Sequence, residues 1–113
     1  MNRRGEAAES LAADFLRAQG LTIVKRNYRC RFGEIDLVAH DGDTLVFVEV
    51  RQRRSDNFGG ARESITATKR KRLITAARHY LARRRGTPPC RFDAVLIRGE
   101  PPQIEWVRNA FGE

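Results

Sequence analysis

Hydrophobic positions repeat with two different periods along the chain, and the change of period separates helical from extended segments. Apolar side chains recur every three or four residues over about residues 5–19 and 62–85, which predicts two amphipathic helices, and Gly20 and Gly86 are placed to end them. Five other segments are rich in β-branched and aromatic residues and are bounded by turn residues, which predicts strands. These segments are residues 21–28, 34–40, 44–52, 91–97 and 103–107. The pattern therefore predicts one α/β domain over residues 1–113, in the order αβββαββ.

The second and third predicted strands are joined by a hairpin signal, Asp41-Gly42-Asp43. Asp-Gly between alternating apolar residues favours a tight turn because glycine tolerates a positive φ. A two-residue loop at Gly42-Asp43 would place Asp36 directly opposite Glu49, and a loop one residue earlier would place it diagonally. Either loop puts Asp36 and Glu49 on one face of the sheet, whereas a three-residue loop would separate them.

Two carboxylates on neighbouring strands suggest a metal site. Strand alternation puts Arg51 on the same face as Glu49, while Val48 and Val50 point to the other face. Asp36 and Glu49, with a backbone carbonyl near Val50, could hold Mg²⁺ or Mn²⁺ beside a phosphate, which is the chemistry of a metal-dependent nuclease. The alternative is that both carboxylates are exposed and paired with arginines.

The charge balance favours a polyanionic partner. Lys and Arg total 22 against 14 Asp and Glu, which gives a formal charge of +8 and a pI near 10.7. The basic residues gather after the third strand and on the second helix, so the candidates for nucleic-acid contact are Arg53, Arg54, Lys69, Lys71 and Arg72. Successive helical residues turn by about 100 degrees, so part of this helix run must be a solvated face. We expect recognition of nucleic acid, with DNA favoured, through its backbone and shape.

Membrane and zinc chemistry are not expected. No stretch approaches the roughly 18 apolar residues of a membrane span, and the N-terminus has no apolar signal core, so a cytoplasmic location is predicted. Cys30 and Cys90 lack metal-ligand spacing. Reduced, buried thiols are the expected state, with a disulfide as the alternative.

Several segments together resemble the bacterial YraN-type family, and they run over almost the whole chain. They are residues 5–9 (GEAAE), 27–37 (NYRCRFGEIDL), 46–50 (VFVEV), 91–93 (RFD) and 110–111 (AF). That family is similar to archaeal Holliday junction resolvases and, by resemblance, to the PD-(D/E)XK nuclease superfamily. The resemblance implies a restriction-endonuclease-like core, a mixed sheet with helices on its faces. Resolvases act as symmetric dimers, so a homodimer is compatible with it, although no dimer seam can be read from the sequence.

The resemblance also assigns residues. Asp36 takes the place of the first metal-binding aspartate, Glu49 that of the second acidic residue, and Glu9 that of a helix glutamate seen in resolvase-like members. An ordinary solvated glutamate is the alternative for Glu9, and Glu34 is a secondary candidate. The superfamily usually has lysine where this chain has Arg51, and arginine, with a pKa above ~12, can bind phosphate but cannot act as a base at neutral pH.

Three functions follow from these residues. The first is a metal-dependent nuclease, endonuclease or resolvase-like, that hydrolyses phosphodiesters in structured or branched DNA. The second is a non-catalytic nucleic-acid-binding protein that keeps the nuclease fold, with Arg51 as the discriminating residue. The third is a small basic protein that binds structured RNA or the ribosome.

Overall fold

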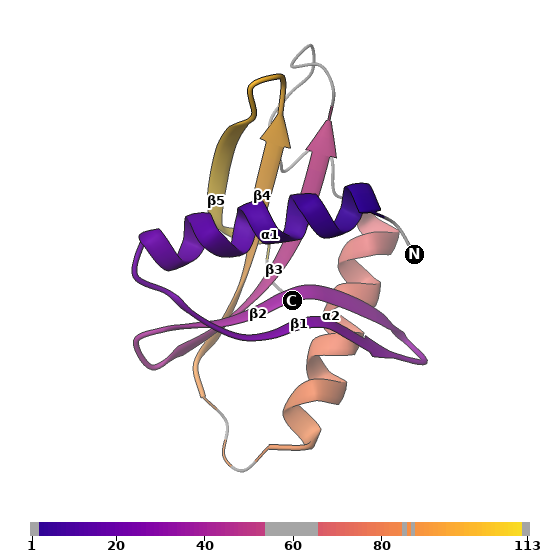
Figure 1. Ribbon diagram of the computed structural model, residues 1–113. Helices are drawn as coiled ribbons and strands as arrows, with labels where there is room; N and C mark the ends of the chain where they lie inside the picture. Colours follow the sequence, from indigo (N-terminus) through magenta and orange to yellow (C-terminus); the bar gives the residue numbers. More distant parts are fainter. Residues whose placement is uncertain (1–2, 54–65, 85, 87, 112–113) are drawn as a thin grey trace.

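The structure, a computed structural model, describes residues 3–53, 66–84, 86 and 88–111 (Figure 1). Its elements are α1 (Arg3–Ala18), β1 (Thr22–Cys30), β2 (Gly33–Asp41), β3 (Thr44–Arg53), α2 (Ala67–Ala82), β4 (Cys90–Arg98) and β5 (Gln103–Phe111). Each expected segment corresponds to one element, with ends that differ by a few residues. Residues 62–65, expected to open the second helix, lie outside the described residues, and β5 continues four residues beyond the expected end at Val107.

The strands form one mixed sheet in the order β1-β2-β3-β4-β5. β3 and β4 are parallel and the other neighbours are antiparallel. Parallel neighbours need a crossover, and α2 lies in the connection between β3 and β4. This arrangement confirms a mixed α/β fold. The restriction-endonuclease-like assignment stays a prediction.

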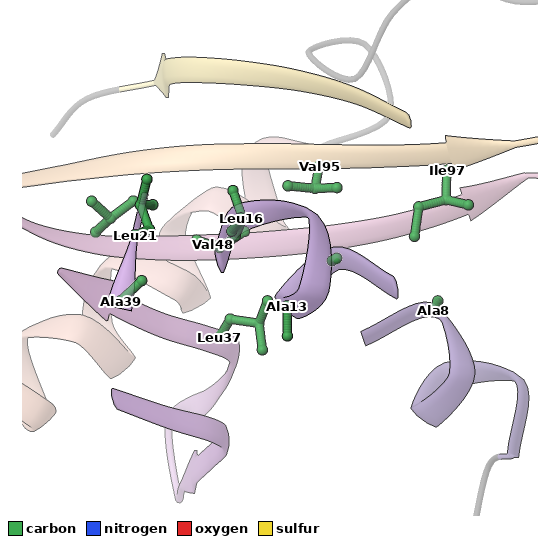
Figure 2. Packing of buried hydrophobic residues seen from close by; sticks show 11 residues of the cluster. Ala8, Ala13, Leu16, Leu21, Leu37, Ala39, Val48, Val95 and Ile97 are labelled. Atoms are coloured by element: carbon green, nitrogen blue, oxygen red, sulfur yellow. The ribbon is translucent and has the colours of Figure 1, made fainter. Parts of the chain in front are cut away.

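The helix α1 packs on one face of the sheet through small and aliphatic side chains (Figure 2). The buried members of this cluster are Ala8, Ala12, Ala13, Leu16, Leu21, Leu37, Ala39, Val46, Val48, Val95 and Ile97. Alanines at three- and four-residue spacing let the helix approach the strands closely, while the branched side chains alternate along β3 and β4 to fill the layer.

The opposite face of the sheet is covered by α2. Its buried side chains Leu73, Ala76 and Ala77 pack against residues of four strands. The strand members of this cluster are Tyr28, Ile35, Val38, Leu45, Phe47 and Phe92. Thr66 caps the helix, since its hydroxyl accepts the backbone N–H of Lys69 at 3.1 Å, and this contact places Lys69 in the first turn.

The loop of the β2–β3 hairpin is Gly42-Asp43, the first of the two-residue loops considered from the sequence. Asp41 pairs with Thr44, so the loop is Gly42-Asp43, and Gly42 has φ +60° as a tight turn requires. The pairing continues from there to Leu37 opposite Val48 and stops one residue before Asp36 and Glu49.

Strand alternation breaks at Asp36. Ile35 belongs to the core on the α2 side and Leu37 to the core on the α1 side. Residues two apart in a regular strand share a face, so β2 must rotate between them. Asp36 therefore lies where the two strands separate and where both sides of the sheet can be reached.

The cysteines and helices bear on two further expectations. Neither Cys30 nor Cys90 is in a disulfide among the described residues, and Cys30 is partly buried. Cys90 is exposed, so the expectation of two buried thiols is wrong for that residue. It is the first residue of β4, and the side chain there is not covered by the core. Neither described helix is long and apolar enough to cross a bilayer.

One fully buried carboxylate ties the last two strands together. Asp93 accepts hydrogen bonds from Arg91 Nε at 3.0 Å, Trp106 Nε1 at 3.0 Å and the Asn109 N–H at 2.9 Å. Arg91 also reaches Asp41 at 2.9 Å, which links β4 to the end of β2. Three donors satisfy the buried charge, so removing the carboxylate leaves several of them unpaired.

We expect Asp93→Ala to lower the free energy of unfolding by about 3–5 kcal/mol, because it breaks this buried network. Asp14→Ala is the control, since Asp14 forms an exposed ion pair with Arg17 and its loss should change stability by less than about 0.5 kcal/mol. Urea denaturation followed by circular dichroism measures both. Equal midpoints for the two variants would contradict this account of Asp93.

Candidate active site

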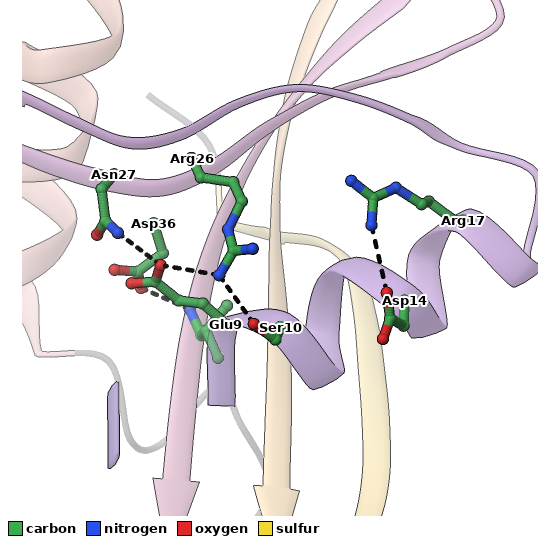
Figure 3. A network of polar contacts seen from close by, with 8 residues as sticks. Glu9, Ser10, Asp14, Arg17, Arg26, Asn27 and Asp36 are labelled. Atoms are coloured by element: carbon green, nitrogen blue, oxygen red, sulfur yellow. Dashed lines mark hydrogen bonds and ion pairs between the residues drawn. The ribbon is translucent and has the colours of Figure 1, made fainter. Parts of the chain in front are cut away.

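The side chain of Asp36 accepts a backbone N–H of β3 that no longer pairs with the backbone of β2. Its Oδ2 accepts the backbone N–H of Val50 at 2.8 Å, just beyond the last β2–β3 pair (Figure 3). The carboxylate is thus held where β2 and β3 cease to pair, and few rotamers can keep this bond. This local break in the ladder is what makes a strand aspartate available as a site residue.

Glu49 lies next to Asp36 and is 8% exposed. Its Oε2 receives a hydrogen bond from Lys69 Nζ at 2.9 Å, and Arg51 Nη1 lies 3.9 Å from the same oxygen. The strand residues 49 and 51 share the α2 side, as alternation predicts, and Lys69 reaches them from the first turn of α2. One buried carboxylate therefore has two cations beside it.

These groups line a cavity of about 610 Å³. Its walls come from the β1–β2 hairpin, β3 and the first half of α2. The lining residues are Arg29, Cys30, Gly33, Glu34, Asp36, Glu49, Val50, Lys69, Arg72 and Leu73. Charged side chains form most of the wall, and Leu73 supplies part of the apolar base, so the cavity suits a small charged ligand more than an apolar one.

Glu9 approaches Asp36 from the α1 side (Figure 3). It is 8% exposed, and its Oε1 accepts a hydrogen bond from Asn27 Nδ2 at 2.7 Å. Arg26 lies 3.9 Å from the same oxygen and donates to Ser10 Oγ at 3.0 Å. Glu9 is therefore not a freely solvated helix glutamate, and it stands beside the cavity rather than in its wall.

The pKa values of Asp36 and Glu9 are both raised by their surroundings. Burial, followed by the hydrogen bond and the charge of Glu49, raises the pKa of Asp36 to about 8, although the Val50 N–H opposes this shift. Burial also raises the pKa of Glu9, against the opposing effects of Arg26 and Asn27. Asp36 is consequently mostly protonated at neutral pH as long as no cation compensates its charge.

The donor set of Asp36 and Glu49 fits a hard divalent cation. No group of three or more His, Cys, Asp or Glu side chains is arranged to hold a metal among residues 3–53, 66–84 and 88–111. Mg²⁺ does not need such a group, because it is commonly held by one or two carboxylates together with waters and substrate phosphate. Because the charge of Glu49 opposes ionisation of Asp36, a cation bound between the two carboxylates would offset this repulsion.

The structure brings only some of the predicted nucleic-acid contacts to this cavity. Lys69 and Arg72 line it, whereas Lys71 is exposed and is absent from its wall. A helix turns by about 100 degrees per residue, so positions 69 and 72 share a side that position 71 cannot reach. Arg54 lies outside the described residues, and of Arg53 only the backbone, at the end of β3, is described.

Comparison with known proteins gives the chain a family. The sequence model of "Uncharacterised protein family UPF0102" matches residues 8–97, a range that includes Glu9, Asp36, Glu49 and Arg51. The chain belongs to the UPF0102 family. This confirms the YraN-type resemblance found in the motifs, while the relation of UPF0102 to PD-(D/E)XK nucleases stays a prediction.

Relatives of the UPF0102 chain align over nearly all of it. A UPF0102 protein of Nitrosomonas europaea is 62% identical over 111 residues, which cover 97% of this chain and 94% of the relative. One of Nitrosospira multiformis is 58% identical over 109 residues, 96% of this chain and 92% of its own. One of Methylobacillus flagellatus is 54% identical over 112 residues, 98% of each chain. The chain and these relatives thus match over nearly their full lengths.

Lys69 is the site residue whose position the sequence did not reveal. The sequence predicts it as a nucleic-acid contact in a basic run of the helix, and the structure shows that its ammonium also binds Glu49. The available signal was the spacing of Lys69, Arg72 and Leu73 on one side of the helix, with Leu73 marking the side that faces the sheet. Which strand residue this side would meet depends on how α2 is placed, and that is a tertiary property.

We expect Asp36→Asn to stabilise the metal-free UPF0102 protein more at pH 9 than at pH 5. The pKa of Asp36 rises from 3.8 to about 8 on folding, so the stability gained from the bound proton is complete below the lower value. That stability is lost as the pH rises through about 8, whereas asparagine cannot ionise and avoids the loss. Urea midpoints in EDTA at pH 5, 7 and 9 measure the difference.

The control for this experiment is Asp43→Asn, since Asp43 is an exposed carboxylate in the hairpin turn. Its midpoints should follow those of the wild type at each pH. Parallel pH profiles for wild type and Asp36→Asn would show that Asp36 does not titrate in this range.

Proposed function

We propose that the protein is a metal-dependent nuclease that hydrolyses phosphodiesters in structured or branched DNA. The observation that carries the proposal is the meeting of Asp36 and Glu49 in one cavity, with Lys69 bound to Glu49 at 2.9 Å. Paired carboxylates with an adjacent cation suit binding of a divalent metal together with a phosphate. The proposal includes a cytoplasmic location, and the expectation that a homodimer acts on paired strands stays a prediction.

Each site residue has a separate task in this proposal. Asp36 and Glu49, with the carbonyl of Val50, would hold Mg²⁺ or Mn²⁺, and Glu9 would add negative charge from the α1 side. The metal, when bound, lowers the pKa of a coordinated water and neutralises charge that develops on the phosphate. Lys69 and Arg51 bind the phosphate oxygens and keep the scissile group against the carboxylates. Arg51 stays charged throughout, so it orients and neutralises but does not remove a proton.

The walls of the cavity support a polyanionic substrate. Arg29 and Arg72 stand beside Lys69 around the two carboxylates. Cations on the β1–β2 hairpin and on α2 can contact phosphates on either side of the scissile one, which favours a nucleic-acid strand over a small phosphate ester. Such contacts do not read base identity, so the substrate would be selected by its shape.

A non-catalytic nucleic-acid-binding protein is the second candidate. The ion pair between Lys69 and Glu49 supports it, because an ammonium group already compensates one of the two carboxylates without any metal. In that case Asp36 would stay protonated and the cavity would bind phosphate through its cations alone. Metal-dependent cleavage separates the two candidates.

We expect Asp36→Asn to lower cleavage of a labelled four-way junction in Mg²⁺ or Mn²⁺ by at least about 100-fold, because the metal loses one of its two carboxylate ligands. Asp43→Asn should cleave like the wild type, since Asp43 is exposed in the turn away from the cavity lining. Flap, single-stranded and duplex DNA in the same assay define the preferred shape. Wild-type cleavage that persists unchanged in Asp36→Asn would refute this site, and binding without cleavage would favour the second candidate.

We expect Lys69→Met to lower the maximal cleavage rate by about 10- to 100-fold, because it removes a cation from the reacting phosphate. Lys71→Met is the matched control on the same helix turn. Lys71 is exposed and outside the cavity wall, so its loss should weaken binding slightly without a change in the maximal rate. Single-turnover rates at saturating enzyme separate rate from affinity. Equal effects of the two substitutions would make Lys69 an ordinary backbone contact.

A further inference from the structure

The tip of the β1–β2 hairpin carries an exposed aromatic ring next to the cavity. Cys30 pairs with Gly33, so Arg31-Phe32 forms a two-residue turn, and Phe32 is 46% exposed. Cys30 and Gly33, on either side of the turn, both line the cavity. Isolated exposed apolar residues are common on protein surfaces, so exposure alone carries no function. The position, support and surroundings of Phe32 are more specific.

The ring of Phe32 is supported from the α2 side. The ring centroids of Phe32 and His79 are 6.0 Å apart, and His79 is itself held by a hydrogen bond between its Nδ1 and the Tyr28 hydroxyl. Gly33 also lies close to α2, since a Cβ at Gly33 would come within 3.2 Å of the Arg72 carbonyl oxygen. The hairpin tip is therefore packed against the helix, and Phe32 is presented at a defined place rather than on a free loop.

The surroundings of Phe32 are cationic. The guanidinium of Arg31 lies 5.4 Å from the centre of the ring. Arg29 and Arg72 stand on the adjoining cavity wall, and Glu34, paired with Arg29 at 3.3 Å, is the nearby acid on the same hairpin. An aromatic ring among cations, beside a cavity proposed to hold a phosphodiester, combines base stacking with phosphate contact.

We infer that Phe32 is a stacking platform for an unpaired nucleobase of the strand that enters the cavity. The inference rests on the proposed nucleic-acid substrate and adds its class, which is DNA with unpaired nucleotides next to the scissile phosphate. In a continuous duplex the faces of the bases are covered by their neighbours, so a single ring can reach a base face only where pairing is interrupted. The arginines beside Phe32 contact the phosphates of the same strand.

The platform can be tested by binding, without cleavage. Fluorescence anisotropy in EDTA compares a labelled splayed-arm DNA with a blunt duplex of equal length for wild type, Phe32→Ala, Phe32→Leu and Phe32→Trp. Stacking is worth about 1–3 kcal/mol per base, so Phe32→Ala and Phe32→Leu should bind splayed-arm DNA roughly 5- to 150-fold more weakly. Both should bind the duplex within about twofold of the wild type, and Phe32→Trp should retain binding to both.

Leucine distinguishes stacking from plain apolar contact, because it keeps much of the apolar volume of Phe32 and has no ring. Val24→Ala is the matched control, since Val24 is 42% exposed on the same hairpin, and neither Val24 nor its chain neighbours line the cavity. It should bind both DNAs like the wild type. Thermal melting of each variant shows that folding is unchanged.

The platform would be overturned by any of three results. These are wild-type affinity of Phe32→Leu for splayed-arm DNA, an equal loss on duplex, and no preference of the wild type for splayed-arm DNA. The proposed nuclease fails by a different result, unchanged cleavage in Asp36→Asn. Weaker binding by Phe32→Ala without any wild-type cleavage would support the platform on a non-catalytic protein.

Discussion

The hydrogen bond from the Val50 N–H to the Asp36 carboxylate is the contact on which the site depends. It stands where the β2–β3 pairing has ended, and it satisfies a backbone donor that the ladder no longer serves. In return it fixes a half-buried carboxylate next to Glu49. Burial and the closeness of Glu49 then raise the pKa of Asp36 to about 8. The point at which β2 and β3 stop pairing thus gives Asp36 a strongly raised pKa.

The charges around this carboxylate are arranged from three directions. Glu9 approaches from α1, Glu49 from the neighbouring strand, and Lys69 from α2. The alternation break in β2 makes this convergence possible, because it opens a point where residues from both faces of the sheet can meet. Cations pair with Glu49 and Glu9, while Asp36 has the backbone donor of Val50. In these contacts Asp36 has a backbone donor where Glu49 and Glu9 have cations, and its pKa is strongly raised.

The helix α2 connects the core to the site. Its apolar side, with Leu73 and Ala76, packs on the sheet, and the adjoining residues Lys69 and Arg72 reach the cavity. The close approach of Gly33 to Arg72 brings the tip of the β1–β2 hairpin to the same helix. A single packing arrangement therefore sets the distance between the carboxylates, their cation and the exposed aromatic ring.

Local periodicity and one tight turn predict the two helices, the five strands and the approach of Asp36 to Glu49. Two of the three loops considered for Asp41-Gly42-Asp43 keep the carboxylates together, and the structure has one of these two, Gly42-Asp43. Three other features come from the tertiary arrangement alone: Lys69 binds Glu49, Glu9 approaches Asp36, and the turn that carries Phe32 lies next to the cavity. Lys69 and Glu49 are 20 positions apart in the chain, so their contact is not a local one. They depend on how helices lie on a twisted sheet, which no local pattern encodes.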